Sequence, residues 1–189
     1  MFDKKDIFCI LINEQYDEGE KEMFLRKSSR RMVMLLFAAL ALAIFFSASA
    51  FAAGPKPLKP AAKDKCPVCG MFVAKYPDFV AQIQFRDGSV AFFDGVKDML
   101  KYYRNLARYV PGKKAADISA LHVTDYYSLR YLDGFKAYYV SGSDVFGPMG
   151  KELVPFGKKS DAQEFLRDHK GRAILSFREI NDAVMKSLE

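Results

Sequence analysis

The feature that most constrains this chain is an apolar run at residues 32–53, which separates an N-terminal segment from the rest of the sequence. Arginine and lysine precede the run, and both Ala48-Ser49-Ala50 and Ala50-Phe51-Ala52 near its end match a small-residue cleavage pattern. A basic region, an apolar core and a small-residue exit are typical of a secretory signal. The sequence therefore predicts an exported protein that folds after the signal.

A permanent membrane anchor is the alternative interpretation, because about 20 apolar residues suffice to span a bilayer. Gly54-Pro55 follows the run at once and favours cleavage, whereas an uncleaved signal would leave the protein associated with the membrane. No cysteine directly follows the apolar core, so a lipid-modified N-terminus is not predicted. Residues 1–22 are rich in acidic side chains, which do not suit a signal, and we expect the biological start at Met23.

Changes in composition divide the chain into four regions. These are a start region and secretory signal at residues 1–53, a Pro/Lys-rich linker at 54–65, a globular domain at 66–180 and a C-terminal tail at 181–189. The domain is long enough to bury one hydrophobic core but not two. We therefore expect a single folded domain in the periplasm.

The formal net charge of +6 belongs to residues 54–189, because residues 1–53 contain equal numbers of acidic and basic side chains. A basic surface favours an anionic partner or membrane. No basic stripe is interleaved with aromatic residues, and the protein is expected to be exported, so nucleic acid is not an expected partner.

Each half of the domain is predicted to contain strand, strand, helix and strand. In the first half we expect these elements at residues 79–85, 90–93, 96–110 and 118–127. In the second half we expect them at residues 135–140, 152–156, 161–169 and 172–177. Asp87-Gly88 marks a hairpin turn between the first two strands, and Ser160 is the expected N-cap of the second helix.

This order of elements predicts the α+β class, with two ββαβ units whose mainly antiparallel strands form one compact domain. The two halves share no repeat at the level of individual residues. Between the first two strands of the second half, residues 141–150 form a connection that is too long for a tight hairpin.

Sulfur atoms are concentrated in Cys66-Pro67-Val68-Cys69-Gly70-Met71. Thiolate and thioether donors select Cu(I), and a Cys-x-x-Cys turn lets both cysteine sulfurs converge on one ion. Met149 lies between Pro148 and Gly150, where a methionine is not expected to be ordinary core. Met71 or Met149 would then complete a three-coordinate copper site.

Other interpretations of the two cysteines remain open. A closed zinc site usually needs four nitrogen or sulfur ligands. The mature chain offers only two cysteines and two histidines, and the histidines do not have the His-x(3–5)-His spacing, so zinc is poorly provided for. A thiol–disulfide exchange pair and a structural disulfide both suit an oxidising compartment. His122 lies in a predicted strand and His169 at the end of a predicted helix, and neither is an expected ligand.

An enzymatic function is not predicted. The sequence contains no Gly-rich phosphate loop, no recognisable Ser-His-Asp set and no paired acids at a recognisable catalytic spacing. The abundant phenylalanine and tyrosine residues are interpreted as core.

Four motifs in the same order resemble the nitrous oxide reductase accessory protein family, NosL. They are CPVCGM at 66–71, AQIQFRDGSVAFFD at 81–94, Met149-Gly150-x-Glu152 followed by Val154-Pro155-Phe156, and a closing pattern at residues 162–177. The resemblance covers about residues 64–180. It implies a periplasmic Cu(I)-binding protein of two ββαβ units that helps to deliver copper to the copper-sulfide centre of nitrous oxide reductase.

The resemblance also implies metal-binding positions at Cys69, with Cys66 beside it, and at Met149. Two departures from the family are visible. Many members are lipoproteins, whereas this chain has a small-residue cleavage pattern. Some members have a histidine two residues after the methionine, where this chain has Lys151. An ammonium cannot bind copper, so Met71, Cys66 or His122 would substitute, or the delivery target differs.

The leading hypothesis is an exported Cu(I) metallochaperone, not an enzyme, with Cys66, Cys69, Met71 and Met149 as metal ligands. Its expected partner is a periplasmic copper enzyme, nitrous oxide reductase above all, or another copper carrier. The alternatives are a periplasmic thiol–disulfide oxidoreductase that uses the same cysteines and a disulfide-stabilised binding module.

Overall fold

The computed structural model describes residues 54–189, which form one compact unit. The predicted signal and the expected start at Met23 lie outside the described residues. Across residues 54–189, no helix combines the length and the hydrophobicity needed to cross a membrane.

The first unit has the predicted order of strand, strand, helix and strand. Its elements are β1 (Ala81–Phe85), β2 (Val90–Phe93), α2 (Val96–Arg104) and β3 (Ile118–Thr124). The hairpin closes at the predicted turn, where Gly88 has a φ of +84° and Asp87 accepts a hydrogen bond from the Ser89 amide. The helix expected over 96–110 is interrupted at Asn105, whose side chain donates to the Lys101 carbonyl, and α3 (Leu106–Tyr109) follows.

The second unit repeats this order. Its elements are β5 (Tyr138–Ser141), β8 (Val154–Phe156), α4 (Lys159–Asp168) and β9 (Ala173–Ser176). The prediction that Ser160 caps α4 is wrong. The helix begins at Lys159, two residues before the predicted start, so Ser160 lies within the first turn. The residue at the N-cap is Lys158, which forms no side-chain cap.

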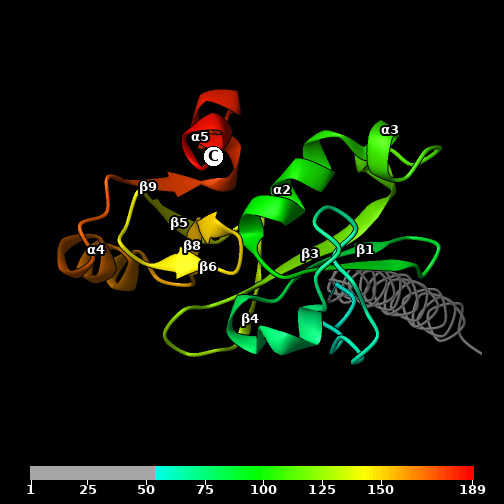
Figure 1. Ribbon diagram of the computed structural model, residues 1–189, viewed down its shortest axis with the longest axis horizontal. Helices are drawn as coiled ribbons and strands as arrows, with labels where there is room; N and C mark the ends of the chain where they lie inside the picture. The colour runs from blue at the N-terminus through cyan, green and yellow to red at the C-terminus, as the bar shows by residue number, and fades with distance from the viewer. Residues whose placement is uncertain (1–53) are drawn as a thin grey trace, which may run out of the picture. The chain divides into compact units, whose positions relative to one another are not determined.

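Both sheets are antiparallel, and the first strand of each unit lies in the centre of its sheet (Figure 1). The strand order is β2-β1-β3 in the first sheet, extended by β4 (Tyr131–Asp133), and β8-β5-β9 in the second. Helix α2 contacts β1 and β2, and α4 contacts all three strands of the second sheet. The predicted α+β class with two ββαβ units is confirmed.

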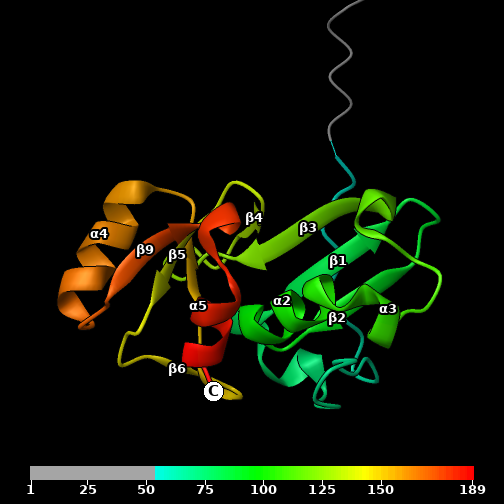
Figure 2. The same cartoon turned by 90° about the horizontal axis from the view of Figure 1, so that it is seen from above.

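The two units share their main hydrophobic core and therefore form one domain. This core contains Ile83, Phe93 and Met99 from the first unit together with Tyr139 and Leu153 from the second, all fully buried. A smaller cluster lies between the second sheet and α4 and consists of Val140, Val154, Phe156, Ala162 and Phe165. Figure 2 shows the two units side by side, with α5 (Asp182–Ser187) between them.

Several elements were not predicted. The connection at 141–150 contains a tight hairpin of β6 (Phe146–Gly147) and β7 (Gly150–Lys151), with Pro148 and Met149 in the turn. Residues expected to form a tail contain α5, which Asn181 caps by accepting a hydrogen bond from the Val184 amide. Short 3₁₀ helices are found at Val73–Lys75, Pro77–Phe79, Ala115–Asp117 and Phe177–Glu179.

The linker at residues 54–65 lies along the first sheet. Gln82 and Gln84 alternate with Ile83 along β1, so they point to the opposite face of the sheet. The Gln82 amide exchanges two hydrogen bonds with the Leu58 backbone, and Gln84 donates to the Lys56 carbonyl. These contacts bury both glutamines and explain how polar side chains occur in a central strand.

Candidate metal centre

The cysteine motif forms a closed loop before the first strand. The Cys66 amide donates to the Met71 carbonyl over 2.9 Å, and the Gly70 amide donates to the Cys66 carbonyl over 2.8 Å. Gly70 has a φ of +81°, a conformation that favours glycine. An isolated bridge between Lys65 and Phe72 holds the two ends of the loop together. This backbone turns both thiols toward the same pocket.

Two carboxylates complete that pocket. Asp94 directly follows β2, and Asp98 lies in the first turn of α2. Ligand atoms of Cys66, Cys69, Asp94 and Asp98 all lie within 4.8 Å of one another, which is close enough for the four side chains to hold one metal ion. Sequence analysis missed both aspartates, although Asp-Gly-x-x-Asp at the start of a predicted helix was a usable signal.

Hydrogen bonds pair each thiol with one carboxylate. The Cys69 thiol donates to Asp94 Oδ1 over 3.2 Å, and the Cys66 thiol donates to Asp98 Oδ2 over 3.5 Å. Cys66 and Asp94 are each 1% exposed. Asp94 Oδ2 is buried and has no hydrogen-bond partner within residues 54–189. An unpaired buried carboxylate oxygen is costly, and a bound cation would satisfy it. The pocket therefore offers a free oxygen donor to a cation.

The environment of the pocket keeps both thiols protonated. Burial is the main cause that raises the pKa of Cys66 to about 11, and a neighbouring carboxylate adds to the effect. Burial first, and then the neighbouring carboxylates, raise the pKa of Cys69 well above its ordinary value. Both cysteines are free thiols in this structure. A reactive disulfide-exchange cysteine instead needs a lowered pKa.

The four donor atoms of the pocket suit two kinds of metal ion. Two sulfurs and two carboxylate oxygens are four donors, the number that a tetrahedral ion such as zinc uses, and neither histidine is among them. The sulfurs remain the donors that a soft ion such as Cu(I) prefers. The arrangement can therefore bind a metal through the two thiols, with carboxylates beside them to accept the displaced protons.

The two predicted methionines lie on different parts of the fold. Met71 closes the cysteine loop through its backbone carbonyl, and its side chain is partly exposed. Met149 is 44% exposed at the turn of the β6–β7 hairpin. The Met149 carbonyl accepts a hydrogen bond from Lys97 in the first turn of α2. The hairpin is thus attached to the same end of α2 that carries Asp94 and Asp98.

The remaining candidates have other partners. The Lys151 ammonium donates to the Ser187 carbonyl over 3.2 Å, at the end of α5. His122 Nε2 lies 3.1 Å from the Pro55 carbonyl oxygen. His169 stacks on Phe165 and pairs with Asp144. Among the described residues, neither histidine belongs to the cluster of Cys66, Cys69, Asp94 and Asp98.

Comparison with known proteins places this chain in a family. The family model NosL matches residues 57–185. The copper-binding lipoprotein NosL of Stutzerimonas stutzeri is 30% identical over 131 residues, and the match spans 65% of this chain and 65% of that relative. The crystal structure of the copper chaperone NosL from Shewanella denitrificans has a TM-score of 0.58 at 21% identity, covering 68% of this chain and 97% of that chain, and shows the same fold. This chain belongs to the NosL family.

Proposed function

We propose that this protein is an exported accessory protein that binds Cu(I) and delivers it to a periplasmic copper enzyme or another copper carrier. The observation that carries this proposal is the convergence of Cys66 and Cys69 on one buried pocket, in a chain of the NosL family. The names of the two relatives, a copper-binding lipoprotein and a copper chaperone, support copper as the cargo. Nitrous oxide reductase is the acceptor that the family resemblance implies.

Copper would bind to the two cysteine sulfurs after both thiols lose their protons. Two thiolates satisfy the preference of Cu(I) for soft donors, and a thioether from Met149 or Met71 would complete a three-coordinate site. Asp94 and Asp98 already accept hydrogen bonds from the thiols and would receive or relay the displaced protons. Soft ligands exchange without breaking the protein fold, so a sulfur-rich acceptor could take over the ion.

A role in copper handling outside the cytoplasm fits the secretory signal predicted at residues 32–53. It also fits the Stutzerimonas relative, which is named a lipoprotein. The rival function, thiol–disulfide exchange, is disfavoured by the raised pKa of both cysteines, because the thiolate is the reactive form. Binding of a metal can displace those protons, whereas an exchange reaction would have to work with the few thiolates present.

Copper titration tests the proposal. The protein is expressed as the full chain, purified reduced without oxygen, and titrated with Cu(I) against a coloured competing chelator. We expect one tightly bound Cu(I), with the affinity lowered at least about a hundredfold in Cys66→Ser and in Cys69→Ser. Ser119→Ala, which is distant in sequence from the loop, serves as the control. Weak binding, or affinity that is unaffected by both cysteine changes, would exclude copper carriage.

A further inference from the structure

Two buried charged residues outside the thiol pocket join the Met149 hairpin to α2. They are Glu152, which follows β7 and is 4% exposed, and Lys97, which is the second residue of α2 and is 5% exposed. Buried charges are expensive unless they are paired and hydrogen-bonded. The hydrogen bonds of Glu152 and Lys97 therefore indicate the structural role of these two buried charges.

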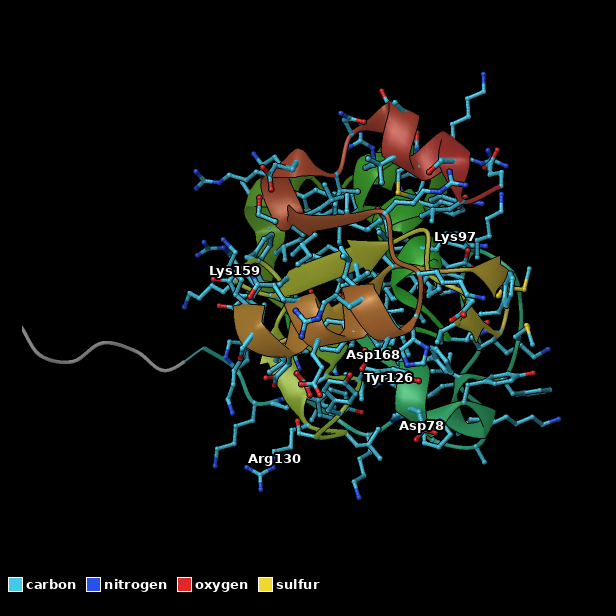
Figure 3. The ribbon with its side chains drawn as sticks, turned by 90° about the vertical axis from the view of Figure 1, so that its left-hand side faces the viewer. Asp78, Lys97, Tyr126, Arg130, Lys159 and Asp168 are labelled. Atoms are coloured by element: carbon cyan, nitrogen blue, oxygen red, sulfur yellow. The ribbon has the colours of Figure 1, made fainter. Side chains whose placement is uncertain are left out.

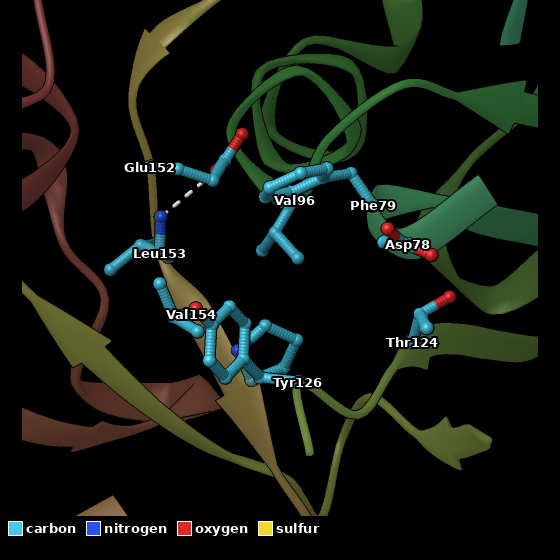
Figure 4. A pocket seen from close by; sticks show the side chains of 9 residues that line it. Asp78, Phe79, Val96, Thr124, Tyr126, Glu152, Leu153 and Val154 are labelled. Atoms are coloured by element: carbon cyan, nitrogen blue, oxygen red, sulfur yellow. Dashed lines mark hydrogen bonds between the residues drawn. The ribbon is translucent and has the colours of Figure 1, made fainter. Parts of the chain in front are cut away.

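Glu152 caps the start of α2 from a distant part of the chain. Its Oε1 atom accepts hydrogen bonds from the Lys97 amide over 2.6 Å and from the Leu153 amide over 2.9 Å. No side chain within the first turn of α2 supplies a cap. A carboxylate at a helix N-terminus satisfies free amides and interacts favourably with the helix dipole. Figure 4 shows Glu152 beside Val96 and its bond to the Leu153 amide, at the edge of a pocket of about 10 Å³.

Two glycines make room for this carboxylate. A Cβ atom at Gly95, the N-cap of α2, would lie 2.2 Å from Glu152 Oε2. A Cβ atom at Gly147, in β6, would lie 3.0 Å from the Cγ and Oε2 atoms of Glu152. The Glu152 side chain is thus enclosed between the helix start and the hairpin. A side chain at Gly95 would collide with its carboxylate, and one at Gly147 would be tightly packed against it.

Lysines hold the hairpin from two sides. The Lys97 ammonium, labelled in Figure 3, donates to the carbonyl of Met149 itself and also reaches the Leu188 carbonyl over 3.5 Å. The Lys151 ammonium donates to the neighbouring Ser187 carbonyl. The hairpin turn is therefore fixed to the start of α2 and to the end of α5.

We propose that Lys97 and Glu152 are positioning residues that fix the Met149 turn at the helix end that carries Asp94 and Asp98, so that the Met149 thioether can join the thiols in binding copper. Lys97 lies between Asp94 and Asp98 in sequence, so the helix end that carries the pocket's carboxylates is the same one that anchors the hairpin. This inference rests on the proposed copper-binding function and deepens it. A thioether on a fixed turn binds without losing loop entropy, whereas a loose turn must be ordered first.

A double-mutant cycle on the full chain tests this role. Cu(I) affinity is measured for Lys97→Leu and Glu152→Gln, alone and combined with Met149→Leu. Each single change is expected to lower affinity about tenfold, as is typical when a residue that orients a ligand is lost. In the Met149→Leu background the same changes are expected to cost nothing further, because the thioether that they position is absent.

A second readout separates positioning from general stability. With methyl-¹³C methionine, Ag(I) as a diamagnetic substitute for Cu(I) should shift the Met149 methyl signal in the wild type and much less in Lys97→Leu. Lys101→Leu is the matched control, since Lys101 lies on the same helix and pairs with the exposed Glu189. Should Glu152→Gln fail to fold, Lys97→Leu keeps the test decisive, because leucine retains much of the apolar bulk of the side chain without adding a sulfur donor.

The outcomes are distinguishable. Equal losses in both backgrounds, or no effect of Met149→Leu on a wild type that binds Cu(I) through its cysteines, would overturn the positioning role and leave the proposed function intact. A wild type that does not bind Cu(I) would overturn both. The inference would be supported if the losses occur only in proteins that retain Met149, and if the Lys97 variant also lacks the shift of the Met149 methyl signal.

Discussion

The two ββαβ units have the same topology but different helix starts. Asp98 is the third residue of α2 and Asp161 the third residue of α4. An aromatic pair also recurs, with ring centroids 5.1 Å apart for Phe93 and Tyr102 and 5.0 Å apart for Phe156 and Phe165. These shared positions show a correspondence between individual residues of the two units, which was not detectable in the sequence alone.

The helix starts differ in what covers them. Asp98 is 3% exposed beneath the cysteine loop, whereas Asp161 is partly exposed and accepts a hydrogen bond from its neighbour Ser160. Neither helix has a local side-chain cap, but α2 receives the distant carboxylate of Glu152. The comparison shows that the candidate metal centre is not a property of the ββαβ unit. It arises where the cysteine loop and the hairpin cover one helix start.

The largest expected effect separates stability from metal binding. Phe165→Ala empties the small core beneath α4 and should lower the free energy of unfolding by about 3–5 kcal/mol. The Cu(I) affinity of the protein that remains folded should not change, because the small core around Phe165 contains none of the proposed ligands or positioning residues. Urea unfolding and copper competition measure the two quantities. A tenfold loss of affinity per folded molecule would mean that the small core beneath α4 also shapes the centre.

The buried Glu152 predicts a pH dependence of stability that α4 lacks. Burial raises the pKa of Glu152 from 4.5 to about 7. The native state therefore holds this proton more tightly than the unfolded chain, and stability should fall as pH rises from about 4.5 to 7. At about 1.4 kcal/mol for each tenfold change in proton affinity, the loss is roughly 3 kcal/mol.

Urea unfolding at several pH values measures this loss as the difference between the wild type and Glu152→Gln. The variant should show a flatter profile over the same range, because an amide does not titrate. Glu164→Gln, at an exposed position of α4, should leave the wild-type profile unchanged. Identical profiles for wild type and Glu152→Gln would show that the carboxylate is ionised throughout.

The two aspartates at equivalent helix positions should differ in metal binding. Asp98→Asn and Asp94→Asn are expected to lower the affinity for Co(II), a spectroscopic substitute for zinc that accepts oxygen donors, at least about tenfold. Cu(I) affinity should change less, because sulfur dominates its binding. Asp161→Asn is the matched control and should have no effect on either metal. If Asp161→Asn weakened Co(II) binding as much, the cluster would not be the site.

The smallest effects concern helix capping. Asn181→Ala should destabilise the protein by about 1 kcal/mol, because Asn181 caps α5. Ser160→Ala should stay within about 0.5 kcal/mol, since Ser160 lies inside α4 and caps nothing. Thermal unfolding of both variants under the same conditions checks the order. A larger loss of stability in Ser160→Ala than in Asn181→Ala would mean that Ser160 is the N-cap of α4, as the sequence pattern indicated.

Local patterns were sufficient to predict the α+β class and the order of elements. Alternating apolar residues and the Asp87-Gly88 turn predicted the first hairpin, and helical spacing predicted α2 and α4, because these signals act between residues that are neighbours in the chain. The motif CPVCGM likewise pointed to the thiols, since a Cys-x-x-Cys turn brings its own sulfurs together. Whether Cys66, Cys69, Met71 and Met149 ligate one ion stays a prediction.

Only the tertiary structure decided which residues surround those thiols. Asp94 and Asp98 are about 30 residues from the cysteines in sequence, and Glu152 and Met149 come from the other unit, so no local pattern links them to the loop. The sequence by itself predicted a secretory signal, and it determined an α+β chain with a sulfur-rich loop. The fold decided that this loop covers the start of α2, because packing the shared core brings distant segments together there and buries their charges.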